Sequence, residues 1–341
     1  MQNGPTSREK TEKEKVIEPP PGLPKLGEEV HSQEAKIEYE IIKVLGQGTF
    51  GLVYLARRRG DGRQFAMKCE HMAVKRRFIK LECGVLEAAF NIQSPHFCKV
   101  IDKGAVADRF NFFTMTLLGP NIWHLRRDRK YQRFSINTAL KVAEQTLQAI
   151  RDLHRIGWLH RDIKPLNFTI GRDEESHTIF IIDFGMARCF KQDGKEIRNP
   201  RLYCPWRGTG RYAPLTAHRH EEQSRRDDVE SWLYMMIELT SGKLPWKACK
   251  GAERDKMRAL KADSRDKLRS QLFEGCPVQA YSRILTYLDK LDYKDIPDYD
   301  YVWKMLDIAR EENGLSYCDP VDWDPSQPYH GARYVPERKF D

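Results

Sequence analysis

The spacing of apolar residues changes along this chain, and the change limits the folds that it can adopt. In residues 37–118 the stretches "IEYEIIKVLG", "GLVYLARR", "RQFAMKCE" and "FNFFTMTLL" predict strands, with "RGDG" at 59–62 as a hairpin turn. Residues 74–90 have helical spacing. Helical spacing returns at Ser135, the expected N-cap of a helix that Gly157 ends, and again in "DVESWLYMMIELTSG". We therefore predict an α+β fold with two lobes: a small antiparallel sheet, a mostly helical second lobe, and a cleft between them.

Composition narrows the class of protein. Of the 341 residues, 40% are hydrophobic and 31% charged, which is typical of a globular domain and not of a disordered or membrane chain. No apolar run is long enough for a bilayer, and no secretory signal is visible. The net charge of +9 favours acidic partners such as acidic proteins, phosphates or nucleic acid. Eight scattered cysteines without zinc spacing predict free thiols in a reducing compartment, and His218 and His220 predict a polar turn rather than a metal site.

The two ends of the chain differ from its middle. Residues 1–36 contain the charge run "SREKTEKEK" and the proline-rich "EPPPGLPK", so we expect a disordered tail. The folded domain should cover residues 37–325, with a first lobe to about residue 118 and a second lobe from 119. Residues 326–341 should form a short C-terminal tail.

A glycine-rich stretch, "GQGTFGLVY", lies between two predicted strands. Gly46, Gly48 and Gly51 would let the backbone approach a phosphate closely, and Val53 could cover a flat ring. A dinucleotide-binding motif would need a helix directly after the glycines. Because a strand follows here, that alternative is disfavoured.

Lys68 lies in the strand "FAMKC", where it could either extend to solvent or bind phosphate oxygens beside an acid. Glu82 on the next helix lies beside the apolar stripe of that helix and could point towards Lys68. Glu87 is the rival partner, and the sequence alone leaves both open.

The stretch "HRDIKPLNF", residues 160–168, follows a long helix. Asp162 and Asn167 are separated by Pro165, so the segment is a loop. The Asp162 carboxylate could accept a hydroxyl proton, Lys164 could neutralise a transferring phosphoryl group, and the Asn167 amide oxygen could bind a cation. Asp183, in "IIDFG", adds a second oxygen ligand of the kind that Mg²⁺ prefers.

These motifs occur in the order of a known set, and at this point the chain resembles the eukaryotic protein kinases over about residues 38–325. The stretches "GTGRYAPLTAHRH" and "RRDDVESWLYMMIELTSGKLPW" resemble the casein kinase 1 group. The stretches "LDYKDIPDYDYV" and "DPVDWD" are most similar to its tau-tubulin kinase branch. The chain departs from the usual kinase pattern in lacking an Ala-Pro-Glu motif after residue 213.

The resemblance implies a bilobal kinase that transfers the γ-phosphate of ATP, with Mg²⁺, to serine or threonine of protein substrates. It places ATP against Gly46, Gln47, Gly48, Gly51, Val53, Ala66, Lys68, Met115 and Leu118. It implies that Lys68 pairs with Glu82, that Asp162 is the base, that Lys164 contacts the γ-phosphate, and that Asn167 and Asp183 bind the metal. Asp228, with Asp227 as the alternative, would brace the catalytic loop.

The segment between Gly185 and Thr209 contains no serine or threonine, and Tyr203 is its single tyrosine. We therefore expect activity without activation-loop phosphorylation. Arg198, Arg207 and Arg211 suit phosphate or carboxylate, so we expect acidic or pre-phosphorylated substrates, cytoskeletal proteins among them. In many kinases the residue equivalent to Arg161 meets a loop phosphate. Here we expect Asp193, Glu196 or a bound anion to balance it.

Several further expectations follow from the resemblance. We expect a monomer without membrane insertion or specific nucleic-acid binding, located in the cytoplasm, with the nucleus as an alternative. The competing interpretations are a pseudokinase-like scaffold and a cytoskeletal binding protein with incidental catalysis. The first would predict loss of Lys68, Asp162 or Asp183, and all three are present.

Overall fold

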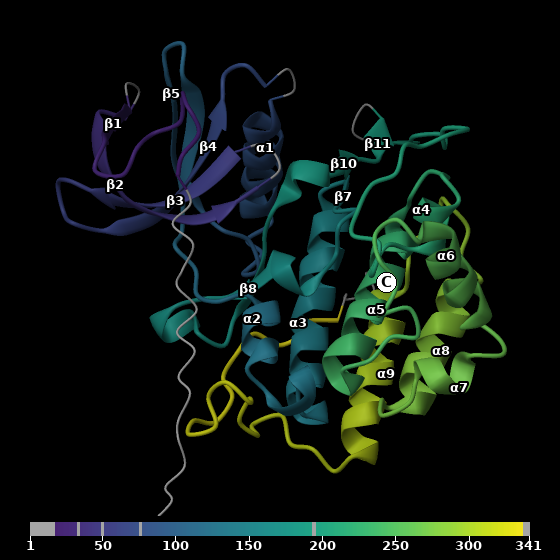
Figure 1. The fold of residues 1–341 in the computed structure, drawn as a ribbon. Helices are drawn as coiled ribbons and strands as arrows, with labels where there is room; N and C mark the ends of the chain where they lie inside the picture. The colour runs from purple at the N-terminus through teal and green to yellow at the C-terminus, as the bar shows by residue number, and fades with distance from the viewer. Residues whose placement is uncertain (1–17, 33–34, 49–50, 75–76, 193–195, 337–341) are drawn as a thin grey trace, which may run out of the picture. The chain divides into compact units, whose positions relative to one another are not determined.

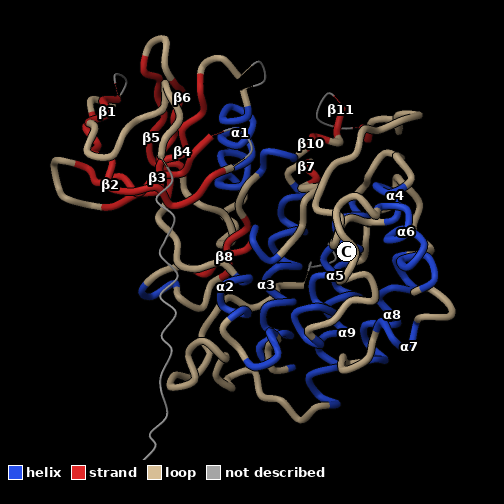
Figure 2. Tube along the Cα trace, viewed as in Figure 1, coloured by secondary structure: helices blue, strands red, loops and turns tan. Residues whose placement is uncertain are grey.

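The computed structural model describes residues 18–32, 35–48, 51–74, 77–192 and 196–336. Packing divides the chain into two compact units, residues 1–76 with 102–114 and residues 77–101 with 115–341 (Figure 1). The helix after residue 77 belongs to the second of these units. Strands dominate the first unit and helices the second, as predicted (Figure 2).

The first unit is built on one six-stranded sheet with the strand order β1-β2-β3-β4-β6-β5. Neighbouring strands from β1 to β4 pair antiparallel. The buried side chains of Tyr54 and Met67, which face each other in the register of β3 and β4, contribute to its core. The strands are β1 (Glu29–Ser32), β2 (Ile37–Gln47), β3 (Gly51–Arg58), β4 (Gln64–His71), β5 (Val100–Val106) and β6 (Phe110–Met115).

Strand β1 corrects the prediction that residues 1–36 form a disordered tail. Residues 29–32 pair with the first residues of β2, and Val30 and Leu23 are buried. A four-residue strand carries too short a pattern to be recognised beside a proline-rich stretch. The burial of two apolar side chains explains why the segment is ordered.

The helices of the second unit surround α3 (Ile136–Arg155) and α5 (Arg225–Ser241), which lie side by side (Figure 1). The Trp232 indole of α5 donates to Thr146 Oγ1 of α3 at 2.8 Å, so the contact is polar as well as apolar. Ser135 caps α3 as predicted, and Gly242 ends α5 with a φ of 76°. The other helices are α1 (Phe78–Asn91), α2 (Ile122–Arg127), α4 (Leu215–His218), α6 (Arg254–Asp263), α7 (Arg269–Leu272), α8 (Val278–Leu288) and α9 (Tyr299–Glu312).

Short strand pairs carry the segments with predicted chemistry. They are β7 (Trp158–Leu159) with β10 (Arg188–Cys189), β8 (Phe168–Ile170) with β9 (Ile179–Ile181), and β11 (Lys191–Gln192) with β12 (Glu196–Ile197). Single 3₁₀ turns cover Lys130–Gln132, Pro165–Asn167, Asp173–Glu175 and Phe184–Met186.

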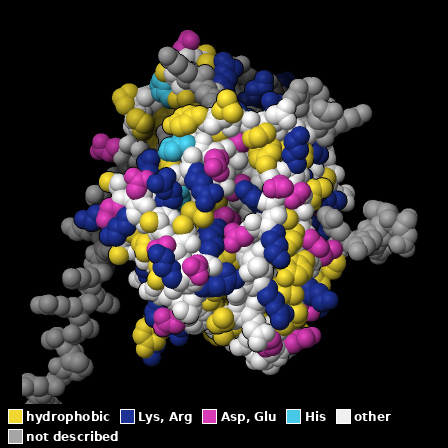
Figure 3. Space-filling model, turned by 90° about the vertical axis from the view of Figure 1, so that its right-hand side faces the viewer, with side chains coloured by type: hydrophobic (Ala, Val, Ile, Leu, Met, Phe, Trp, Pro, Cys, Tyr) yellow, Lys and Arg dark blue, Asp and Glu magenta, His cyan; other side chains and the backbone are white. Residues whose placement is uncertain are grey.

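The chain after α9, including the expected C-terminal tail at 326–341, packs against α3. The Asp322 carboxylate accepts hydrogen bonds from both the amide and the hydroxyl of Ser135, at 2.7 Å each. Further along, Arg151 donates to the hydroxyl of Tyr334 at 3.1 Å. All eight cysteines are free. None of the helices in the described ranges is both long and apolar enough to span a bilayer. Basic and acidic side chains alternate over the face in Figure 3.

Candidate active site

The loop at residues 160–167 is held from below by a carboxylate of α5. Asp228 is buried, and its two oxygens accept the backbone N–H groups of His160 at 2.7 Å and Arg161 at 2.8 Å. Asp227 instead accepts the amide of Ser224 at 2.6 Å and caps its own helix. The geometry therefore assigns the brace to Asp228 rather than to Asp227.

His154 of α3 completes this brace. Its Nε2 lies 3.0 Å from Asp228, and its Nδ1 lies 2.6 Å from the hydroxyl of Tyr299. Burial lowers the pKa of His154, although Asp228 opposes the decrease. A neutral ring that donates from Nε2 and accepts at Nδ1 satisfies both contacts.

The Asp162 carboxylate is held by the segment before α4 as well as by its own loop. Its Oδ1 accepts from the amide of Thr209 at 2.8 Å and from the hydroxyl of Thr209 at 2.7 Å. Its Oδ2 accepts from Lys164 Nζ at 2.5 Å. A carboxylate oriented in this way can accept a hydroxyl proton, and the adjacent ammonium can stabilise negative charge on a phosphoryl group.

Asn167 and Asp183 lie at the same end of the strand pair β8–β9. Phe168 pairs with Ile181, and the amide of Ile182 donates to the Asn167 carbonyl at 2.9 Å. The Asn167 side-chain nitrogen donates to the Asp162 carbonyl at 2.9 Å, which leaves its amide oxygen for a cation. The Asp183 residue is exposed and has a φ of 64°. An amide oxygen beside a carboxylate fits Mg²⁺, which would add a compensating charge for phosphate.

Within the described residues the Arg161 guanidinium binds a backbone carbonyl, and the expected carboxylate or anion partner stays a prediction. Its Nε and Nη2 both donate to the Met186 carbonyl, at 2.9 and 2.7 Å. Burial, together with the charges of Arg207 and Arg188, lowers the pKa of Arg161 to about 10. Asp193 and the Glu196 side chain, two of the expected partners, lie outside the described residues.

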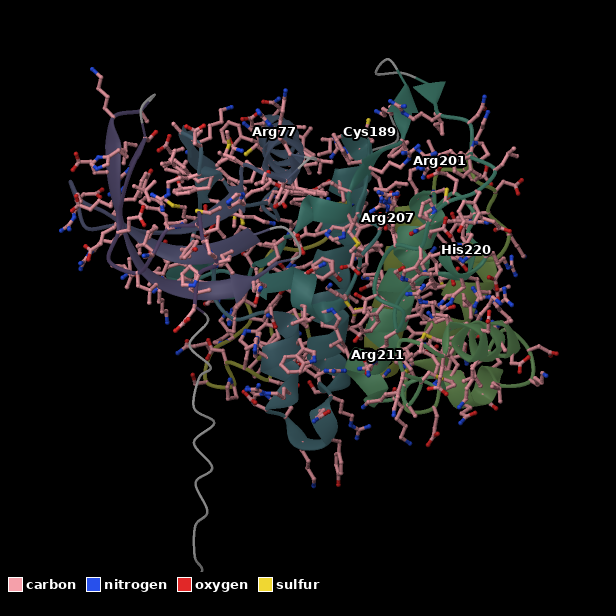
Figure 4. All side chains as sticks on the ribbon, turned by 45° about the horizontal axis from the view of Figure 1, so that its top comes forward. Arg77, Cys189, Arg201, Arg207, Arg211 and His220 are labelled. Carbon is pink, nitrogen blue, oxygen red and sulfur yellow. The ribbon has the colours of Figure 1, made fainter. Side chains whose placement is uncertain are left out.

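The expected anion-binding arginines do not lie together. Figure 4 shows Arg211 set apart from Arg207. The Arg211 guanidinium pairs at 3.2 Å with Glu238, a fully buried carboxylate of α5. Arg198 is exposed, and its Nε donates to the Lys191 carbonyl at 3.0 Å. For Arg207, the described residues include no carboxylate within ion-pair distance.

Glu222 neutralises Arg188 and Arg201, two other arginines of the segment between Gly185 and Thr209. Its carboxylate pairs with Arg188 at 3.2 Å and with both Nε and Nη2 of Arg201. Burial opposes ionisation, but the hydrogen bonds from Arg201 and the charge of Arg188 lower the pKa of Glu222. Tyr203, the single tyrosine of the segment, is exposed and stacks on His220 with ring centroids 5.2 Å apart.

The first unit carries the predicted phosphate loop and Lys68. Gly51 needs its lack of a side chain, because a Cβ there would lie 1.9 Å from the Cys69 carbonyl oxygen. Val53 pairs with Lys68 across β3 and β4. Gly46, Gln47 and Gly48 are described, whereas the tip of this loop at 49–50 lies outside the described residues. Ala66 is buried and Val53 half-buried.

The two glutamates that the sequence offers as possible partners of Lys68 differ in burial. On α1, Glu82 is 3% exposed, whereas Glu87 is exposed. Met115 and Leu118, the expected adenine contacts, are half-buried. The pairing of Lys68 with Glu82, which belong to different units, stays a prediction.

Three residues with direct roles in this geometry were not predicted. Thr209 binds Asp162, and Glu238 binds Arg211. Lys261 of α6 binds the carbonyl of Gly210, which lies between Thr209 and Arg211 in the chain. The stretch "GTGRYA" contains Thr209, but the motif indicates a family and not a contact with Asp162. Glu238 interrupts the apolar run "WLYMMIEL" of α5, which indicates a buried acid but not its partner, whereas no sequence signal distinguishes Lys261 from the other charged residues of α6.

The comparison with known families agrees with this geometry. Residues 39–284 match the protein kinase domain, and the chain belongs to the protein kinase family. The family uses ATP with Mg²⁺ and acts on proteins.

Curated relatives narrow the class further. The chain is 37% identical over 305 residues to the serine/threonine-protein kinase spe-6 of Caenorhabditis elegans, covering 89% of this chain and 79% of that protein. It is 34% identical over 291 residues to a "Probable serine/threonine-protein kinase" of Dictyostelium discoideum, covering 85% of this chain and 57% of that protein. The expected serine/threonine protein kinase activity is therefore confirmed.

Proposed function

We propose that this kinase belongs to the casein kinase 1 group, closest to the tau-tubulin kinase branch, and that it is active without activation-loop phosphorylation. The contact between Arg161 and the Met186 carbonyl supports the second part most strongly. In kinases switched by phosphorylation, a loop phosphate would meet this arginine. Here a backbone carbonyl already orients the guanidinium, and Asp162 is already bound by Thr209.

A preference for acidic or phosphorylated substrates is the second part of the proposal. Arg161, Arg188 and Arg207 place positive charge beside the catalytic loop, and after burial the charges of Arg207 and Arg188 are the next causes of the lowered pKa of Arg161. Glu222 pairs with Arg188 and Arg201, and among the described residues no carboxylate lies within ion-pair distance of Arg207. A guanidinium without a carboxylate partner suits a substrate phosphate or carboxylate. Arg207 is therefore the centre of the proposed substrate site, and Arg211 is not.

Activity without phosphorylation can be tested directly. The protein is treated with phosphatase, shown by mass spectrometry to carry no phosphate, and assayed with radiolabelled ATP and Mg²⁺ on casein, tubulin and a basic control protein. We expect transfer to casein and tubulin by the wild type and none by Asp183→Asn. Activity that appears only after phosphate is restored to the protein would contradict the proposal.

The substrate preference needs a separate experiment with a matched control. Arg207→Ala is compared with Arg283→Ala, which removes the same charge from an exposed position on α8. We expect Arg207→Ala to lower kcat/KM about tenfold on a phosphorylated peptide, the loss of roughly one charge-assisted hydrogen bond, and much less on its unphosphorylated form. An equal effect on both peptides would contradict the preference. Arg211→Ala is unsuitable, because it would leave the buried Glu238 with one partner fewer.

A further inference from the structure

A buried lysine of α6 binds the backbone of the turn that contacts Asp162. Lys261 is fully buried, and its Nζ donates to the carbonyl oxygens of Gly210 at 2.8 Å and Ala213 at 2.5 Å. The same nitrogen lies 3.3 Å from Nε2 of His218. Three potential acceptors therefore surround this one side chain.

These contacts match a charged ammonium group, which has three hydrogens to donate. Burial, followed by the charge of Lys261, lowers the pKa of His218 to about 4, so the ring is neutral and its Nε2 can accept. The rings of Tyr234 and Trp246 each lie 5.1 Å from Nζ and favour a cation there. Burial and, to a smaller extent, the charge of Arg265 lower the pKa of Lys261, while the charge of Glu230 opposes the decrease.

The rest of the turn at residues 209–213 is also held by side chains. The Trp246 indole donates to the Arg211 carbonyl at 2.7 Å, and the Tyr212 hydroxyl binds Glu238. Within the turn, the amides of Tyr212 and Ala213 both donate to the Thr209 carbonyl at 2.9 Å. A displacement of the Gly210 and Ala213 carbonyls would therefore move Thr209.

Glu230 binds the backbone at Leu215, just after this turn. It accepts the amide of Leu215 at 3.0 Å and pairs with Arg265 at 2.9 Å. Arg265 follows Lys261 by four residues along the chain. The region of α6 thus binds this segment twice, through Lys261 directly and through Arg265 by way of Glu230.

We propose that Lys261 is a positioning residue for phosphoryl transfer, which keeps Thr209 against Asp162 by binding the carbonyls of Gly210 and Ala213. The inference needs only the kinase activity of the family and not the proposed group or substrate preference. Lys261 touches neither substrate nor Asp162, so its effect must pass through Thr209. Loss of its contacts should change the orientation of Asp162 while nucleotide binding stays the same.

The first test compares Lys261→Met with Lys267→Met in the full chain. Lys267 is exposed and pairs with Asp263, so it serves as the control. With casein and ATP, we expect kcat of Lys261→Met to fall about tenfold or more, since small misplacements of catalytic groups cost this much. The KM for ATP should stay within about twofold, and Lys267→Met should match the wild type. An unchanged kcat would overturn the proposal.

A double-mutant cycle separates positioning from a general loss of stability. Thr209→Val removes the hydroxyl contact with Asp162 and should itself lower kcat. If Lys261 acts through Thr209, the double variant Lys261→Met with Thr209→Val should be little worse than the more impaired single variant. Effects that add in full as free energies would show that Lys261 acts elsewhere, and would overturn the proposal.

Lys261→Arg provides a second route if Lys261→Met does not fold. Arginine keeps the charge, but its planar group cannot place donors on all three acceptors as lysine does. We expect a folded protein with a smaller fall in kcat and faster hydrogen exchange at the amides of residues 209–213 than in Lys267→Met. Wild-type kcat with wild-type exchange, or a fall in kcat without faster exchange, would overturn the proposal.

Discussion

The buried carboxylate of Asp228 maintains the conformation of the catalytic loop at residues 160–167. It accepts two backbone N–H groups and contacts His154, and these contacts lower its pKa against the effect of burial. Arg161 has a φ of 64°, an unfavourable conformation for a residue with a side chain. The hydrogen bond to its amide helps to hold it there.

Replacing one of these acceptors tests the brace. Asp228→Asn keeps the shape but turns one acceptor into a donor that faces a backbone N–H group. We expect a loss of unfolding free energy of about 1–3 kcal/mol, the usual cost of a buried unsatisfied donor, with a large fall in kcat. Denaturant unfolding and steady-state kinetics measure the two effects. Wild-type kcat in a folded variant would contradict the assignment.

The neighbouring Asp227 should make the free energy of unfolding depend on pH, because its pKa is shifted in the opposite direction to that of Asp228. Burial raises the pKa of Asp227 to about 6, although hydrogen bonds from Thr216 and Ser224 oppose the increase. A carboxyl group whose pKa is raised in the folded state binds its proton more tightly there than in the unfolded chain. Its contribution to the free energy of unfolding is therefore complete below the unfolded-state pKa near 4, and it is lost as the pH rises through 6. The loss is about 3 kcal/mol at most.

Asp227→Asn should remove this dependence. We expect the stability of the variant relative to wild type to increase between about pH 4 and 6 and to stay constant above pH 7. Urea unfolding across this range provides the measurement. A difference that does not change with pH would show that Asp227 titrates normally.

At the scale of elements, the turn before α4 depends on close backbone packing against the catalytic loop. Gly208 has a φ of 97°, and a Cβ there would lie 2.8 Å from the carbonyl oxygen of Arg161. The conformation and the contact both exclude a side chain. The turn reaches Asp162 because glycine lets two backbones approach.

Gly208→Ala should therefore separate the turn from the loop. We expect kcat to fall by roughly tenfold or more, because Thr209 follows directly and orients Asp162. Gly60→Ala is the matched control, since a Cβ at Gly60 meets no atom within 4 Å. Assays with casein compare the two variants, and equal activity would show that the approach of the backbones is not needed.

At the scale of the whole molecule, the chain after α9 stabilises the long helix α3. Tyr329 and Tyr334 are buried, and their hydroxyls bind Gln145 and Arg151 of α3. The Val335 carbonyl accepts a second bond from Arg151 at 2.7 Å. The segment predicted as a short tail thus belongs to the core of the second unit.

Deleting residues 326–341 should lower the unfolding free energy by at least about 3 kcal/mol, because two buried aromatic side chains are lost. It also removes the hydrogen bonds that Gln145 and Arg151 make to Tyr329, Tyr334 and Val335. Thermal and denaturant unfolding measure the loss. Deleting residues 337–341 alone keeps Tyr329, Tyr334 and Val335 and is therefore the control. Similar stability of both deletions would show that the packing contributes little.

The sequence by itself determined the features that depend on neighbours along the chain. Apolar spacing and the cap at Ser135 predicted the main strands and helices, because these signals act within one or two turns. The catalytic loop with Asp162 and Asn167 was recognisable because its residues lie within a few positions of each other. Asp183 was recognisable at the end of its strand.

Only the tertiary structure decided which charged groups meet. It assigned the brace to Asp228 rather than Asp227, buried Glu82 and exposed Glu87, paired Arg211 with Glu238, and gave Arg161 a carbonyl for a partner. It also showed the contacts of Lys261 with the carbonyls of Gly210 and Ala213. Every residue has a backbone carbonyl, so a side chain that binds one leaves no pattern in the sequence. Burial depends on elements that are far apart in the chain. The sequence therefore could not show which charged side chains of the site are buried and which groups they bind.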